Sequence, residues 1–273
     1  MRKHFPYLVL ASEAKDPTRF FNVPVGLLEI VLKEKFFAPF ELLMYFKTES
    51  KSGQMRITTE AINKAAADLN VTPRTVRNNL KRLLKRNWIG RFRSGGYILR
   101  GFDKLRRMEK EWTRTAVIFD RNLHLKKFRE FVIAACIGRL VSRQRARLWR
   151  ERLSGERKGT PNVRKQPLPT LFPIAGEAMA QIYGISVGTA FNWKNAAHKV
   201  GFITVEKILR PVHPEWMRAF PDEAHRVIQR DGRYFLQYPD KVKCNLKFCR
   251  RRSLTAYGKN LNHPERHRAG AGG

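Results

Sequence analysis

The sequence predicts a mainly α-helical chain with small β-strands, an α+β fold built from two similar units. Apolar residues recur at helical spacing along much of the 273-residue chain, which indicates amphipathic helices. Short strand-like runs joined by glycines follow one of these helices. The stretch around Asn70 also aligns without a gap with the stretch around Gly184, 114 positions further along. Such self-similarity is typical of a repeated structural unit.

Residues 1–35 are predicted to form an extension that packs on the first unit. Within it, PYLVL is typical of a strand and VGLLEIVLKE of a helix. The start of the chain becomes acidic too soon for a secretory signal, and no apolar run approaches the roughly 18 residues of a membrane span. Three cysteines provide no disulfide framework. We therefore expect a soluble protein of a reducing compartment, with no membrane partner.

The first unit is predicted to span residues 36–110 and to begin with the helix FAPFELLMYFKTE. A short strand at Met55–Ile57 leads into a second helix, RITTEAINKAAADL, whose alanines allow another helix to cross closely. A tight turn at Asn70 follows. The next helix begins cleanly, because Thr72 is a favourable N-cap and Pro73 suits the first helical position.

The helix after Thr72 has one apolar face and one cationic face. Val76, Leu80 and Leu83 recur at helical spacing, which predicts a buried stripe. No carboxylate occurs from Arg74 to Trp88, so the opposite face is positively charged. The candidate binding residues on and beside this cationic face are Arg74, Thr75, Arg77, Asn78, Lys81, Arg82 and Lys85.

A predicted hairpin completes the first unit. The runs WIGRF and YILRGF are joined by Ser94, Gly95 and Gly96, and glycines suit a tight hairpin turn. Arg91 and Arg93 lie on this hairpin and are also candidate binding residues. Helix, strand, helix, turn, basic helix and hairpin follow in this order, and the unit resembles a winged helix-turn-helix domain. The resemblance implies that the basic helix enters the major groove of DNA and that the hairpin, or wing, reaches an adjacent backbone or minor groove.

Residues 111–127 are predicted to be an irregular linker, and residues 128–240 a second unit of the same kind. Its first helix is the apolar stretch FREFVIAACIGRL, which a basic insertion at residues 141–168 follows. The candidate binding residues of the insertion, which recur every three or four positions, are Arg143, Arg147 and Arg150. They form either a strip that contacts DNA phosphates or a solvated helix end, and the scarcity of acidic neighbours favours phosphate contact.

The repeat predicts a second groove helix in the second unit. Lys194 takes the place of Leu80, and because lysine is awkward in a core, a rotated stripe of Ala190, Trp193 and Ala197 is expected. The candidate binding residues of this helix are Thr189, Asn192, Asn195 and Lys199. The asparagines suit adenine edges. This face is less basic than the first, so packing on the first unit or on a partner stays open as an alternative.

The second hairpin is predicted to be longer than the first. FITVEKILRPV is typical of a strand, and RYFLQYP at residues 233–239 is expected to return beside it. A turn is predicted at Asp231 and Gly232, because Asp-Gly is a strong hairpin signal.

Residues 241–273 are predicted to form a basic, disordered tail. Four residues of the tail have a spacing close to that of a two-Cys, two-His zinc finger: Cys244, Cys249, His263 and His267. Pro264 would break the helix that carries the histidines in such a finger, so no metal is predicted. The sequence also lacks a GxxxxGK[ST] phosphate loop, a paired-histidine helix and a G-x-S-x-G elbow. We therefore predict neither a cofactor nor an enzyme.

The charge of the chain indicates a polyanionic partner. Lys and Arg total 55 against 23 Asp and Glu, a formal net charge of +32, and such an excess destabilises a compact protein unless a polyanion is bound. We expect double-stranded DNA, with Arg74 and Lys81 donating to guanine and Asn78 contacting adenine. The expected location is the cytoplasm, in association with the nucleoid. Two non-identical units suit an asymmetric or directly repeated site.

Tandem winged helices on one basic chain resemble plasmid replication initiators, which bind repeated origin sites and recruit replication machinery. The resemblance implies replication initiation, and a transcription regulator of a plasmid or other mobile element fits equally. Two alternatives from other classes stay open. One is an RNA-binding or ribosome-associated basic protein. The other is a scaffold that recruits a partner, such as replication or transcription machinery, through the second unit.

Overall fold

The computed structural model describes residues 20–50, 53–92, 96–113, 115–157 and 168–250, which form helices and small antiparallel sheets. In chain order, the elements up to residue 113 are β1 (Phe20–Pro24), α1 (Val25–Lys33), α2 (Phe37–Glu49), β2 (Gln54–Met55), α3 (Thr59–Asp68), α4 (Pro73–Lys85), β3 (Ile89–Arg91), β4 (Tyr97–Leu99) and α5 (Phe102–Met108). The later elements are β5 (Thr115–Asp120), α6 (Arg121–His124), the 3₁₀ turn η2 (Leu125–Lys127), α7 (Phe128–Arg157), β6 (Phe172–Pro173), α8 (Gly176–Tyr183), α9 (Val187–Lys199), β7 (Ile203–Glu206), β8 (Leu209–Val212), α10 (Pro214–Ala219), the 3₁₀ turn η4 (Pro221–Arg226), β9 (Val227–Arg230), β10 (Arg233–Gln237), β11 (Lys241–Cys244) and β12 (Phe248–Arg250).

The stretch from α2 to β4 follows the predicted order of elements. Thr72 caps α4 through its hydroxyl oxygen, which accepts a hydrogen bond from Thr75 N at 3.2 Å, and Pro73 lies in the first turn. Asn70 has a φ of 52°, in the left-handed region that lets the chain turn sharply from α3 into α4. After α4, β3 pairs with β4, and β2 pairs with the other edge of β4, so the sheet order is β2-β4-β3.

The stretch from α7 to β11 repeats these features 114 positions further along. Gly184 has a φ of 64°, and Ser186 Oγ accepts a hydrogen bond from Thr189 N at 3.1 Å. The residues that follow the two helices, Asn87 and Gly201, also both have positive φ. The sheet order is β6-β11-β7, so β11 takes the place of β4. The same local interactions therefore begin and end α4 and α9.

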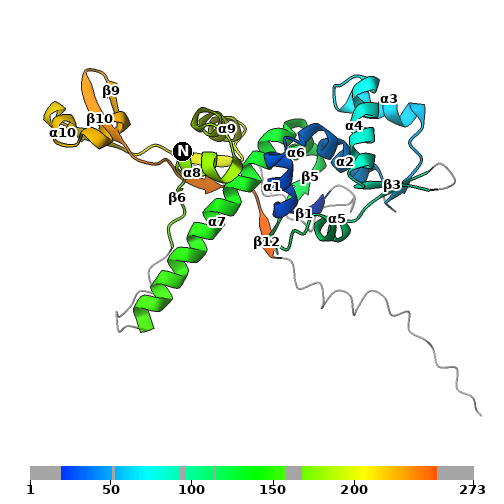
Figure 1. Cartoon of the computed structure of the whole chain (residues 1–273), viewed down its shortest axis with the longest axis horizontal. Coiled ribbons are helices and arrows are strands. Elements are labelled where there is room, and N and C mark those ends of the chain that lie inside the picture. Colours follow the sequence, from blue (N-terminus) through cyan, green and yellow to red (C-terminus); the bar gives the residue numbers. More distant parts are fainter. Residues whose placement is uncertain (1–19, 51–52, 93–95, 114, 158–167, 251–273) are drawn as a thin grey trace, which may run out of the picture.

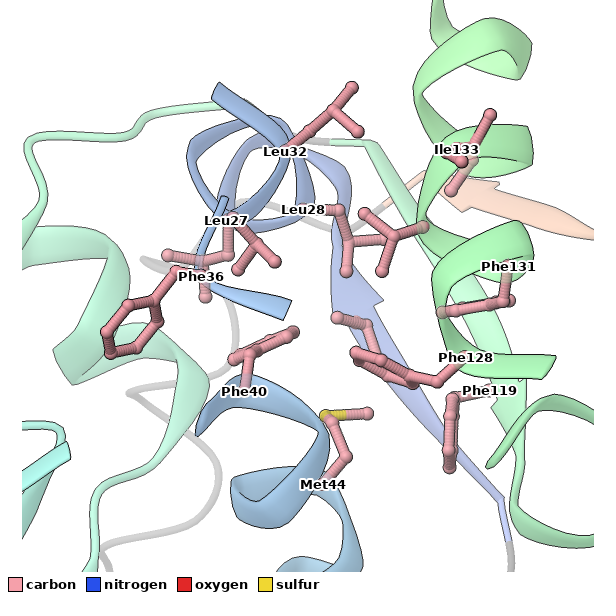
Figure 2. Close-up of a cluster of buried hydrophobic side chains, with 14 of the residues drawn as sticks. Leu27, Leu28, Leu32, Phe36, Phe40, Met44, Phe119, Phe128, Phe131 and Ile133 are labelled. Atoms are coloured by element: carbon pink, nitrogen blue, oxygen red, sulfur yellow. The ribbon is translucent and has the colours of Figure 1, made fainter. Parts of the chain in front are cut away.

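A third sheet, of order β1-β5-β12, lies at the centre of the molecule with α1, α2 and α7. Figure 2 shows Leu27 and Leu28 of α1 beside Phe40 of α2, Phe119 of β5 and Phe131 of α7, and all five side chains are fully buried. Burial of each such side chain stabilises the fold by about 1.5–3 kcal/mol. The same core continues into α3, α4, α8 and α9. The N-terminal helix α1 is therefore part of one continuous core that extends to both α4 and α9.

Residues 111–127 do not form the predicted irregular linker. They contain β5, which pairs with β1 along one edge and with β12 along the other. Val117 and Phe119 of β5 are fully buried. The prediction was wrong because the short TAVIFD run pairs with strands near both ends of the described chain, and no local signal indicates such distant partners.

Residues 241–250 form β11 and β12 rather than the start of a disordered tail. β11 pairs with β6 and β7, and Val242 is fully buried. The predicted FITVEKILRPV strand is divided into β7 and β8. The return strand at residues 233–239 pairs with β8, as predicted, and with β9, whereas β7 pairs with β11. The KVKC run of β11 was hard to recognise because its lysines, Lys241 and Lys243, are exposed on the opposite face. Residues 251–273 lie outside the described part of the chain.

The segment between β7 and β11 carries a sheet of its own, of order β8-β10-β9. Asp231 and Gly232 join β9 to β10 with φ values of 47° and 73°, so the predicted Asp-Gly turn is confirmed. Figure 1 shows an elongated molecule, with this sheet and α10 at one end and α3 and α4 near the other.

Helix α7 is 30 residues long, and its second half contains residues 141–157 of the predicted basic insertion. The first half packs against α1 and α9, whereas the second half projects from the body of the molecule (Figure 1). Among the described residues, no helix combines the length and the apolar character that crossing a membrane requires.

Candidate nucleic-acid interface

Helix α4 presents opposite faces to the core and to solvent. Val76, Leu80 and Leu83 are at most 6% exposed, as predicted. The exposed side chains, which together are called the α4 face below, are Arg74, Arg77, Asn78, Lys81, Arg82 and Lys85. Thr75 is half-buried, and its hydroxyl lies 2.9 Å from that of Thr72, so it belongs to the helix cap. The helix therefore directs a row of cations and one amide toward solvent.

The cations of the α4 face form no ion pair with any carboxylate in the part of the chain that the structure describes. Acidic side chains pair elsewhere, for example Glu109 with Arg86 and Glu29 with Arg139. Arg82 packs over the Phe36 ring, 5.0 Å from its centroid. The α4 face can therefore contact phosphates without first breaking an ion pair.

Arg86 anchors the end of α4 and does not belong to the α4 face. Its guanidinium donates to the two carboxylate oxygens of Glu109 at 2.8 and 2.7 Å and also pairs with Glu34. Trp88 Nε1 donates to Glu109 at 2.6 Å. The hydrogen bonds from Arg86, and then from Trp88, hold the pKa of Glu109 below its usual range although burial opposes them. This network joins the end of α4 to the ends of α1 and α5.

The β3–β4 hairpin adjoins α4 and adds cationic surface beside it. Arg91 in β3 is exposed, with its guanidinium 5.8 Å from the ring centroid of Tyr97 in β4. Arg93, another predicted binding residue, lies outside the described residues. Arg100 turns back instead, because its Nε donates to Asn87 O at 2.5 Å. It closes the turn after α4 and does not reach outward.

The predicted binding residues of α9 differ in exposure. Asn192 and Lys199 are exposed, whereas Thr189 and Asn195 are half-buried. The Thr189 hydroxyl lies 2.8 Å from that of Ser186 in the helix cap, as Thr75 does in α4. The direct candidates for contact with a ligand are therefore Asn192 and Lys199.

The rotated core stripe predicted for α9 is confirmed, because Ala190, Trp193 and Ala197 are all buried. Lys194 is buried beside them, where α4 has a leucine. Its Nζ lies 2.5 Å from Asp240 Oδ2, and each side chain of the pair is only 5% exposed. The sequence did not reveal this partner, since Asp240 lies 46 positions further along the chain.

Two apolar residues on the outward side of α9 were not among the predicted binding residues. Val187 is 47% exposed and Phe191 is 40% exposed. They occupy the positions of Pro73 and Arg77 in α4. The repeat alignment places both residues on the outward side of α9, but neither is a cation or an amide, the residue types that were predicted to contact DNA.

The three arginines predicted on α7 lie on its projecting half, and all three are exposed: Arg143, Arg147 and Arg150. Arg147 pairs with Glu151 at 2.7 Å, and both side chains are exposed. Such a pair contributes little to the stability of the fold, so Arg147 can exchange it for a contact with a phosphate. Trp149 on the same half is 41% exposed. This half of α7 therefore offers cations and an aromatic ring.

The structure brings some of these surfaces together and separates others. The α4 face and the β3–β4 hairpin adjoin, whereas α4 and α9 are separated by the central core. In Figure 1 both helices lie along the upper side of the molecule, and the arginine-bearing half of α7 projects from the lower side.

Cys244 of the predicted tail is partly buried and packs against the core. Its Sγ lies 3.4 Å from Ala134 O, and burial raises the pKa of its thiol to about 12. His263 and His267 lie outside the described residues. Within the described ranges, no three side chains gather in a way that would hold a metal ion.

No protein-family model, curated protein or solved structure matches the chain. What the α4 face binds must therefore be inferred from its charge, its shape and its place in the fold.

Proposed function

We propose that the chain is a sequence-specific, double-stranded DNA-binding protein whose helix α4 enters the major groove. The α4 face carries the proposal, because it sets exposed cations and an amide on a helix whose other side is fixed in the core. An α-helix fits the major groove, where Arg or Lys donates to guanine and Asn pairs with adenine. Cations that contact phosphates release condensed counterions and supply much of the affinity.

We propose further that the chain contains two winged helix-turn-helix units. The support is the shared order of elements, the matching helix caps at Thr72 and Ser186, and the matching sheet orders. The β3–β4 hairpin would serve as the first wing. Two different units on one chain suit an asymmetric or directly repeated site. This arrangement supports a replication initiator or transcription regulator of a plasmid or mobile element, acting at the nucleoid in the cytoplasm.

Selection of bound duplexes from a random pool tests the proposal. The pool carries a randomised core of about 30 base pairs, roughly three helical turns, and an excess of structured RNA competes for the protein. The parent should enrich one sequence. Arg74→Ala and Asn78→Ala should each relax the preference at one base pair and weaken binding by about 1–3 kcal/mol. Lys104→Ala, which removes an exposed cation from α5, should leave the enriched sequence unchanged.

Two outcomes would contradict the proposal. If no duplex is enriched and the structured RNA is retained instead, the chain is an RNA-binding protein. If both α4 variants bind the enriched duplex as tightly as the parent, the assignment of α4 to the groove is wrong.

A further inference from the structure

The outward side of α9 differs in chemistry from the α4 face at matching positions. Phe191 stands where α4 has Arg77, and Asn192 stands where α4 has Asn78. Val187 lies one turn before Phe191, so the two apolar side chains share a side of the helix. The surface called the α9 face below consists of Val187, Phe191, Asn192 and Lys199.

The exposure of the two apolar residues is not explained by packing within the protein. The core side of α9 is formed by buried residues, among them Ala190 and Trp193, whereas Val187 and Phe191 remain 47% and 40% exposed. The Phe191 ring has the Lys207 ammonium 5.8 Å from its centroid. Exposed apolar groups do not bind phosphate, so this face is suited to a different ligand surface from that of α4.

In the major groove of DNA, apolar side chains and amide side chains each contact a particular group on the bases. The thymine methyl is the apolar group that a base pair presents there, and Asn contacts the adenine N6 and N7 atoms bidentately. Guanine is contacted mainly by Arg or Lys. The α9 face has Lys199 only at its C-terminal end, where it can contact a phosphate, and Lys207 adds a second cation at the rim.

We propose that the α9 face recognises an A·T-rich segment, while the α4 face recognises a segment that contains guanine. The target is then a site with two chemically different halves. The inference rests on the proposed DNA binding and names the sequence class that each helix selects. Phe191 and Val187 contact thymine methyl groups, Asn192 contacts adenine, and Lys199 and Lys207 contact the backbone.

Two matched double variants of the full-length chain test whether α9 selects the A·T-rich segment and α4 the segment that contains guanine. Both are compared with the parent in the selection experiment described above. Phe191→Ala with Asn192→Ala alters α9, and Arg77→Ala with Asn78→Ala alters the equivalent positions of α4. All four side chains are exposed, so circular dichroism and thermal melting should match the parent. The α9 variant should lose only the A·T-rich block and bind the parent site about 5- to 100-fold more weakly. The α4 variant should lose only the block that contains guanine.

A third variant, Phe191→Arg, gives α9 the residue type that α4 has at this position. It should change one base pair of the A·T-rich block to a preference for guanine. This gain of a new preference cannot result from loss of folding.

The outcomes separate this inference from the proposed function. If the parent enriches no sequence, specific DNA binding is wrong and this inference falls with it. If the α4 variant alters the site but the α9 variant binds as the parent does, DNA binding stands and the inference is wrong. Loss of a G·C-rich block in the α9 variant would also overturn the inference.

Discussion

The buried pair of Lys194 and Asp240 is the main residue-scale difference between the core of α9 and that of α4. Lys194 Nζ lies 2.5 Å from Asp240 Oδ2 and also donates to Ile174 O at 3.3 Å. Removing two charges from water is costly, and close pairing only partly offsets this cost. The pair joins α9 to the residues just before β11 and just after β6, so it helps to select which strand returns beside β7.

We predict that Asp240→Ala lowers the free energy of unfolding by about 3–5 kcal/mol, because it leaves the Lys194 ammonium buried without a counter-charge. Urea denaturation at neutral pH measures the change. The double variant Lys194→Leu with Asp240→Val, which gives α9 the leucine that α4 has at position 80, should recover most of the loss. A single variant as stable as the parent would show that the pair is hydrated and contributes little.

At the scale of elements, helix boundaries and hairpins between neighbouring strands could be predicted from the sequence, but the pairing of strands far apart in the chain could not. Thr72 and Pro73 mark the start of α4 because capping depends on neighbouring residues. The pairing of β5 with β1 and β12 depends on partners near opposite ends of the described chain. Propensity and periodicity carry no information on such partners, so the linker and the tail were assigned wrongly.

In the candidate site, too, features that depend on neighbouring residues could be predicted, whereas features that depend on distant residues could not. The exposure of the α4 face follows from 3.6-residue periodicity, so its residues could be identified from the sequence. The availability of its cations could not, because that depends on where acids such as Glu109 find partners. The repeat alignment indicates the outward positions of Val187 and Phe191. Neither residue is charged, so the sequence did not mark them as candidates for contact with a polyanion.

The position of β11 and β12 at the end of the described residues leads to a prediction about truncation. A chain that ends at Arg250 should keep the melting temperature of the parent within a few degrees, because β11 and β12 remain. A chain that ends at Asp240 should unfold at a much lower temperature, since it lacks one strand in each of two sheets. Thermal melting followed by circular dichroism compares the two. Equal melting temperatures would mean that β11 and β12 do not contribute to the core.

At the scale of the whole molecule, charge and shape act together. The net charge is +32, and described acids such as Glu34 and Glu109 form ion pairs that join core elements. The α4 face is left cationic near one end of an elongated molecule, and helix α9 lies along the same side in Figure 1. A long, straight polyanion such as a duplex can extend along this side, with counterion release driving its association.

The central claim is that the α4 face itself, and not the overall charge, binds duplex DNA. Two variants of equal net charge separate these possibilities, each with five cations changed to glutamine. The first changes the cations of the α4 face: Arg74, Arg77, Lys81, Arg82 and Lys85. The second changes exposed lysines elsewhere: Lys35, Lys104, Lys110, Lys126 and Lys127.

The measurement is the salt dependence of the affinity of each variant for a duplex of about 30 base pairs, roughly three helical turns. For the first variant, the slope of log affinity against log salt should fall by roughly 0.9 for each phosphate that is no longer neutralised, and for the second it should stay close to that of the parent. Equal reductions in the slope for both variants would contradict the account, because binding would then follow net charge alone.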